Sequence, residues 1–264
     1  MGMAFFTTSD GVRINYTDRA GDGPVAVLLS GFSGIQAEWS YQIPGLEARG
    51  YRVVTMDWRS HGQSERTTKN LRVSRLAADL HELFELLKID EITLVGHSMG
   101  GSVIWAYLSL FGQEKLKQLV IVDESPKLLN EGNWTAGIRN LTWSTFGTVS
   151  KTFIKQHLTA VPVAPEFKAL LKEDKVKNPF DFDLAYPLMK NHLLEDWRQD
   201  LADCTLKTLF VAGGASPLCK IGYYHEFENL LNQNSSLKVI QKAGHLPHLE
   251  IPEEFNQVFF EFIY

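Results

Sequence analysis

The 264-residue chain has little cysteine, no run of basic residues and no long apolar stretch. Its two cysteines, Cys204 and Cys219, lie in different predicted elements and show no metal-ligand spacing. Two free thiols are therefore expected rather than a disulfide or a zinc site. Neither of the common glycine-rich phosphate loops, GxxxxGK[ST] and GxGxxG, occurs in the sequence. We predict that the protein uses no metal and no cofactor.

The charge and hydropathy patterns argue against two further kinds of partner. A net charge of −5 without a basic cluster is unlike a nucleic-acid-binding protein. The apolar stretches are too short, and too often interrupted by glycine or charge, to span a bilayer. The N-terminal MGMAFFTTSDG lacks the features of a secretory signal. We expect a cytoplasmic protein, a monomer or a homodimer, with neither nucleic acid nor membrane as its partner.

Short apolar runs alternate with helical segments along most of the chain. MAFFTTS and VRINYTD, joined at SDG, predict an antiparallel hairpin. The apolar runs that follow show little alternation, as strands covered on both faces do. They are VAVLLSG, YRVVTMD, EITLVG, LKQLVIVD, LKTLFVAGG and LKVIQKAG. With helical segments such as VSRLAADLHELFELLKI between them, they predict an α/β fold with a mostly parallel eight-stranded sheet and helices on both faces.

One interval interrupts this alternation. From residue 125 to residue 205 no strand is evident, whereas aromatic residues are frequent. We predict a core made of residues 1–124 and 206–264, with a mostly helical insertion at residues 125–205 over the C-terminal edge of the sheet. Insertions at that edge commonly form lids or substrate-binding caps.

The stretch EITLVGHSMGG carries a candidate nucleophile. It contains G-x-S-x-G at residues 96–100, between an apolar strand and an apolar helix. A tight turn at this point would display the Ser98 hydroxyl above the sheet, at the positive end of the following helix. The general base that a serine needs is predicted to be His245, which directly follows the last strand in KAGHLPHLEIPEEF. His248 is the alternative, and its expected role is a hydrogen bond within the same loop.

A reaction at an ester or similar carbonyl also needs donors for the oxyanion. The backbone N–H groups of Met99 and of Phe32, which lies in VAVLLSGFSG, are the candidates. Gly31 would let the main chain at Phe32 approach the site closely.

Four segments together resemble the α/β-hydrolase fold over nearly the whole chain. They are SGF, DWRSHGQSE, GHSMGG and GHLPHLEIPEEF, in this order. The resemblance extends to the haloperoxidase and carboxylesterase-like branch and, less closely, to the cofactor-free dioxygenases that cleave N-heteroaromatic rings. Those dioxygenases carry a histidine where this chain has Met99. Haloalkane dehalogenases and epoxide hydrolases use an aspartate nucleophile, from which Ser98 differs.

The resemblance also guides the choice of the acid that orients the histidine. Most members of the fold place it after the strand equivalent to TLFVAGG, where this chain has only Ala215, Ser216 and Pro217. Some members place it at the end of the preceding strand, and Asp123 in LVIVDESPK occupies that position. We predict Asp123 as the acid, with Glu124 and a dyad assisted by Ser216 as alternatives.

Three functional hypotheses follow from these residues. The first is a serine hydrolase, a carboxylesterase that cleaves a small hydrophobic ester through an acyl-enzyme. The second is a cofactor-independent oxygenase of a hydroxylated heteroaromatic compound, and the third is a receptor-like slow hydrolase or binder. The candidate walls of a hydrophobic pocket, which are equally candidates for the core of the insertion, are Trp39, Trp134 and Trp143.

Overall fold

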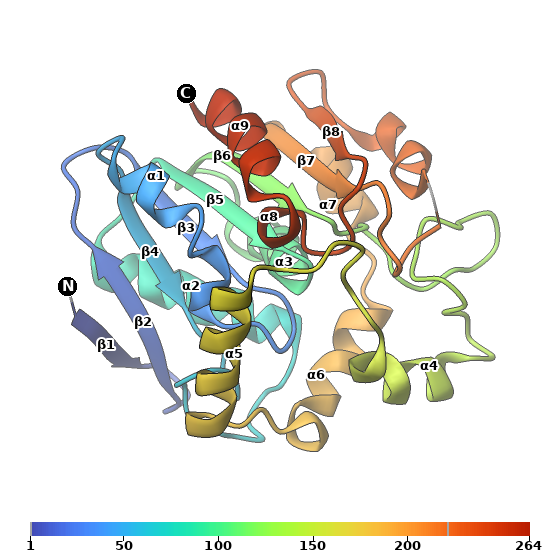
Figure 1. Ribbon diagram of the computed structural model, residues 1–264, viewed down its shortest axis with the longest axis horizontal. Coiled ribbons are helices and arrows are strands. Elements are labelled where there is room, and N and C mark those ends of the chain that lie inside the picture. Colours follow the sequence, from blue (N-terminus) through green and yellow to red (C-terminus); the bar gives the residue numbers. More distant parts are fainter. Residues whose placement is uncertain (1, 221) are drawn as a thin grey trace.

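Eight strands form one sheet in the computed structural model, which describes residues 2–220 and 222–264 (Figure 1). The strand order is β1-β2-β4-β3-β5-β6-β7-β8. β2 is antiparallel to both β1 and β4, and the remaining neighbours are parallel. The strands are β1 (Gly2–Thr7), β2 (Arg13–Arg19), β3 (Val25–Leu29), β4 (Arg52–Met56), β5 (Ile92–His97), β6 (Leu116–Val122), β7 (Lys207–Gly213) and β8 (Ser236–Ile240). The predicted hairpin and the mostly parallel eight-stranded sheet are confirmed.

Helices cover both faces of this sheet. They are α1 (Ile43–Glu47), α2 (Val73–Leu87), α3 (Met99–Phe111), α4 (Phe146–Thr152), α5 (Pro165–Lys177), α6 (Phe182–Leu194), α7 (Arg198–Asp203), α8 (Pro247–Glu250) and α9 (Pro252–Ile263). Short 3₁₀ turns are η1 (Gln36–Trp39), η2 (Phe153–Lys155), η3 (Tyr223–Glu226) and η4 (Glu228–Leu230). Within the described ranges, no helix is both long enough and apolar enough to cross a membrane.

The apolar strands supply two cores, one on each face. In β3, Val27 and Leu29 pack with α2 and α3, whereas Ala26 and Leu28 pack with α1 and α9. Successive side chains of a strand point to opposite faces, so a strand covered on both sides is apolar at every position. This is why the strand sequences lack the alternation of a sheet with one face in water.

Helices α4 to α7 occupy the interval between β6 and β7, which has no named strand among the described residues. Figure 1 shows α4, α5 and α6 outside the sheet, at the bottom of the view. α5 is mostly exposed, since Phe167 is its single buried residue. The division of the chain into a core (residues 1–124 and 206–264) and a cap (residues 125–205) stays a prediction.

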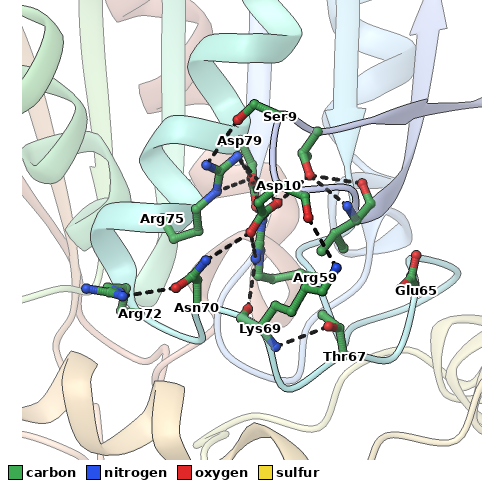
Figure 2. A network of polar contacts seen from close by, with 12 residues as sticks. Ser9, Asp10, Arg59, Glu65, Thr67, Lys69, Asn70, Arg72, Arg75 and Asp79 are labelled. Carbon is green, nitrogen blue, oxygen red and sulfur yellow. Dashed lines mark hydrogen bonds and ion pairs between the residues drawn. The ribbon is translucent and has the colours of Figure 1, made fainter.

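A buried arginine joins the DWRSHGQSE loop to two other elements. Arg59 donates two hydrogen bonds of 2.7 Å to Asp79 in α2, and bonds of 2.9 and 3.0 Å to Asp10 between β1 and β2 (Figure 2). The side chains of Arg59 and Asp79 are fully buried. Paired geometry of this kind compensates for the removal of both charges from water.

Replacing Asp79 with leucine would leave the buried guanidinium of Arg59 with one carboxylate, that of the more exposed Asp10. We predict that Asp79→Leu lowers the free energy of unfolding by about 3 kcal/mol, measured by urea denaturation. The matched control is Glu173→Gln, which breaks the exposed pair with Lys177 and should change stability little. Equal effects of the two substitutions would contradict the assignment of Arg59 as a structural link.

Candidate active site

Ser98 lies in a strained turn between β5 and α3. Its φ and ψ are 51° and −124°, a conformation that residues with a side chain rarely adopt. Glycines make the turn possible: a Cβ at Gly96 would lie 2.5 Å from the main chain of Gly100, and a Cβ at Gly100 would lie 2.6 Å from the carbonyl oxygen of Leu29. The turn expected from G-x-S-x-G is present, and it places Ser98 at the positive end of α3.

Asp123 and His245 are bonded to each other at the C-terminal edge of the sheet. His245 Nδ1 lies 2.7 Å from Asp123 Oδ2. Because an ionised carboxylate only accepts hydrogen bonds, Nδ1 carries the proton, and Nε2 is the unprotonated nitrogen of the neutral ring. Nε2 is the atom that a general base would use.

Three further donors hold the Asp123 carboxylate. They are the backbone N–H of Gly213 at 2.8 Å, the Ser216 hydroxyl at 2.7 Å and the Tyr223 hydroxyl at 3.0 Å. Ser216, which stands where most members of the resembled fold have their acid, thus supports the carboxylate of the neighbouring strand. With both oxygens occupied, the orientation of the carboxylate is fixed.

Glu124 has a different environment. It accepts a 2.8 Å hydrogen bond from Ser102 and faces His192 of α6 at 3.6 Å. Burial raises its pKa to about 8. The structure therefore brings Asp123, and not Glu124, to His245.

A second carboxylate holds the main chain around His245. Glu250 accepts hydrogen bonds of 2.9 Å from the backbone N–H groups of Gly244 and Leu246. It also accepts bonds of 2.7 and 2.8 Å from Ala160 and Val161 of the predicted cap. The histidine loop and the segment after α4 are thereby joined, a role of Glu250 that no sequence pattern indicates.

Ser98 and His245 line the same cavity, which has a volume of about 180 Å³. In the described part of the chain no hydrogen bond joins their side chains, a common finding in structures without substrate. Apolar residues make up much of the wall. They include Phe32, Ile35, Phe153, Leu158, Phe167, Leu171, Leu246 and Leu249.

The two predicted oxyanion donors lie next to Ser98. Met99 is the first residue of α3, and Phe32 lines the cavity. A Cβ on Gly31 would lie 3.2 Å from Ser98 Cβ, so glycine permits the close approach of this loop. The role of these two N–H groups stays a prediction.

The three tryptophans expected as possible pocket walls are not among the cavity-lining residues. Trp39 is fully buried and stacks on His248, with ring centroids 4.6 Å apart. Trp134 is buried against the main chain of Lys127, to whose carbonyl it donates a 2.9 Å bond, and Trp143 is 65% exposed. This expectation was wrong, because aromatic content does not indicate the direction in which a side chain points.

Burial lowers the pKa of His245, and the hydrogen bond with Asp123 offsets this in part. Nearby charges act as well: His97 lowers the pKa, and Glu38 raises it. The ring is therefore held in its neutral form, which is the form that can take up a proton near neutral pH.

One cluster in the described residues has the donor atoms for a metal ion. Atoms of Glu38, His97 and His248 all lie within 4.8 Å of one another. Glu38 Oε1 forms an ion pair with His97 Nδ1, and His248 Nε2 lies 3.2 Å from the same oxygen. These contacts account for the three side chains, and we assign no metal to the cluster. His248 contacts Glu38 from another loop, so the expected hydrogen bond within its own loop was wrong.

Comparisons with known proteins agree with this architecture. A family model described as "alpha/beta hydrolase fold" matches residues 24–252. The chain is 27% identical to 3-oxoadipate enol-lactonase 1 of Acinetobacter baylyi, covering 96% of this chain and 92% of that protein. It is 31% identical to a non-heme haloperoxidase of Rhodococcus erythropolis, over 48% and 46% of the two chains. The solved structure of an esterase from Exiguobacterium antarcticum superimposes with a TM-score of 0.87 at 22% identity, covering 100% of this chain and 99% of that one.

We predict that His245 titrates below pH 6.5, as followed by NMR of labelled histidine. Because the Asp123 carboxylate favours the protonated ring, Asp123→Asn should lower this pKa further. Glu124→Gln removes a neighbouring carboxylate that does not contact His245, and it should leave the titration unchanged. A larger shift in Glu124→Gln than in Asp123→Asn would refute the pairing.

Proposed function

The chain belongs to the α/β hydrolase fold family, and on this premise we propose that it is a serine hydrolase, a carboxylesterase that cleaves small hydrophobic esters. The observation that carries the proposal is the buried Asp123–His245 pair, whose histidine lines the same cavity as Ser98 in its strained turn. A nucleophile, a base and an orienting acid are the three parts that acyl transfer requires.

In the proposed reaction Ser98 Oγ attacks the ester carbonyl carbon while His245 Nε2 takes the hydroxyl proton. Asp123 keeps its bond to Nδ1–H and stabilises the imidazolium. The N–H groups of Phe32 and Met99 stabilise the oxyanion. The C–O bond of the ester breaks, His245 protonates the departing alcohol, and a water molecule then hydrolyses the acyl group on Ser98 by the same steps.

The cavity supports a preference for a short apolar acyl group. Its volume of about 180 Å³ is below the range of about 300–1,000 Å³ that is usual for pockets of drug-sized ligands. Phe153, Phe167 and Leu171 contribute to its wall from the predicted cap, and Leu249 from the histidine loop. Apolar walls of this kind favour substrates that bury hydrocarbon next to the reacting carbonyl.

Lys175 contributes a positively charged side chain to the cavity lining. It lines the cavity from α5, four residues after Leu171 and eight after Phe167, so all three lie on one face of the helix. No other lysine or arginine lines this cavity in the described residues. We propose that Lys175 extends the substrate range beyond neutral esters to short esters whose acyl chain ends in a carboxylate.

Ser98→Ala should abolish hydrolysis of 4-nitrophenyl butyrate in a spectrophotometric assay, because the nucleophile is lost. Asp123→Asn should lower kcat about 10³- to 10⁴-fold through loss of the correct histidine tautomer. Ser216→Ala should cost less than about tenfold, because Asp123 keeps three other donors. Full activity of folded Ser98→Ala would exclude the proposed mechanism.

Lys175→Gln should reduce the preference for a carboxylate-ended ester. The quantity to measure is kcat/KM for 4-nitrophenyl hydrogen glutarate divided by kcat/KM for the neutral butyrate. We expect this ratio to fall about twofold to fivefold, as for an ion pair at an exposed site. Lys172→Gln is the matched control, since Lys172 lies on the same helix but does not line the cavity. An unchanged ratio in Lys175→Gln would rule out the anion preference.

A further inference from the structure

A second buried polar cluster lies beside the proposed catalytic residues. His97, the residue before Ser98, places Nδ1 against Oε1 of Glu38 from η1, and His248 Nε2 of α8 lies 3.2 Å from the same oxygen. All three side chains are nearly inaccessible to solvent. The proposed mechanism uses none of them, although buried polar groups are costly unless they are paired.

The contacts of His97 determine its protonation. Its Nε2 lies 2.8 Å from the carbonyl oxygen of His245, and because a carbonyl only accepts, Nε2 must carry a hydrogen. Nδ1 faces a carboxylate, in an ion pair rather than a well-aligned hydrogen bond. Burial opposes a charge on this ring, but the charge and contact of Glu38 outweigh it and raise the pKa of His97. The contact with Glu38 therefore favours the protonated ring, in which Nε2 donates to the carbonyl of His245 and Nδ1 faces the carboxylate.

The groups around His97 agree with this state. Burial opposes ionisation of Glu38, yet the charges and contacts of His97 and His248 lower its pKa to about 2. Burial lowers the pKa of His248 to about 4, so its ring is neutral near pH 7. The other titratable groups that face His97 are His245, whose ring centroid is 4.8 Å away, and Asp123, which acts through its charge. One cation and one anion therefore face each other, with a neutral ring beside them.

We infer that His97 is a positioning residue: held by Glu38, it fixes the main chain of His245 relative to Ser98. His97 is covalently next to Ser98 and one hydrogen bond from His245, so it is the shortest link between the two. Glu38 lies in η1, a few residues after Phe32, and so connects the oxyanion loop to the same point. This inference rests on the proposed function for its kinetic consequence, but its structural part stands independently.

The link matters because proton transfer needs Ser98 Oγ and His245 Nε2 about 2.6–3.2 Å apart. The ring of His245 is already oriented by Asp123, but its Cα position is set by the loop. Displacement of a reacting group by about 1 Å can cost about a hundredfold in rate. Loss of the His97 bond should therefore act on kcat more than on substrate binding.

The direct test is NMR of the protein with ¹⁵N-labelled histidine. One histidine should stay protonated on both ring nitrogens to a higher pH than an ordinary histidine, and its signals should disappear in His97→Gln. In Glu38→Gln the ring of His97 should become neutral, since its counter-charge is gone. A neutral His97 at pH 7 in the unmodified protein would overturn the ion pair. His225→Gln, in an exposed pair with Glu228, is the control and should not affect these signals.

Kinetics test the positioning role. His97→Leu should lower kcat for 4-nitrophenyl butyrate about 10- to 100-fold with less than about a threefold change in KM. His97→Gln carries an amide N–H near the position of Nε2, and it should recover most of the lost rate. A residue needed only for folding would instead lower the fraction of active protein without changing kcat per folded molecule, as judged from circular dichroism.

The outcomes separate this inference from the proposed function. The Nδ1–H resonance of His245 should be sharp in the unmodified protein and in His97→Gln, and should broaden in His97→Leu, whether or not the ester is the right substrate. If Ser98→Ala keeps its activity, the serine mechanism is wrong. The Nδ1–H resonance of His245 would still test the positioning role of His97. An unaltered resonance and unaltered kcat in folded His97→Leu would refute it. If His97→Leu does not fold, the Nδ1–H resonance of His245 and kcat are compared in His97→Gln and Glu38→Gln instead. Unaltered values in Glu38→Gln would then refute the positioning role.

Discussion

The 2.7 Å bond between Asp123 Oδ2 and His245 Nδ1 is the contact on which the arrangement of the site depends. It joins the ends of two strands that are far apart in sequence, and it determines which nitrogen of His245 is free. The sheet order makes it possible, because β6 lies between β5, which ends at the Ser98 turn, and β7, which is followed by Ser216. The Gly213, Ser216 and Tyr223 donors then hold the carboxylate from the β7 side. Burial of this pair keeps water from competing for the bond.

Much of this could be predicted from sequence because it depends on local patterns. The G-x-S-x-G pattern requires a strained turn, and the turn is strained at Ser98 as expected. Apolar runs without alternation indicated strands covered on both faces, and the two cores account for this. The choice of Asp123 followed from the lack of a carboxylate at the usual position. Ser216 stands where the acid is expected, and the end of β6 is the nearest alternative in the strand order. That serine proved to be a donor to the carboxylate rather than its replacement.

Other features escaped prediction because they depend on long-range packing. Glu38, His97 and His248 come from three distant segments, and no spacing in the sequence indicates that they meet. The directions of Trp39 and Trp143 also depend on packing. Trp39 points into the core beside His248 and Trp143 points toward solvent, so neither side chain reaches the cavity. The cavity wall comes instead from the loop after β3, from η2 and α5, and from the histidine loop with α8. Contacts such as that of Glu250 with the main chain of Ala160 hold these segments together.

The central claim is that Ser98 is an activated nucleophile, and covalent labelling tests it most directly. The protein would be treated with a fluorophosphonate, digested and mapped by tandem mass spectrometry. Activation by His245 and Asp123 predicts one adduct per chain, on the hydroxyl of Ser98. Protein that is unfolded before the treatment should not be labelled. A protein that stays unlabelled at Ser98 under conditions in which it hydrolyses esters would contradict the account.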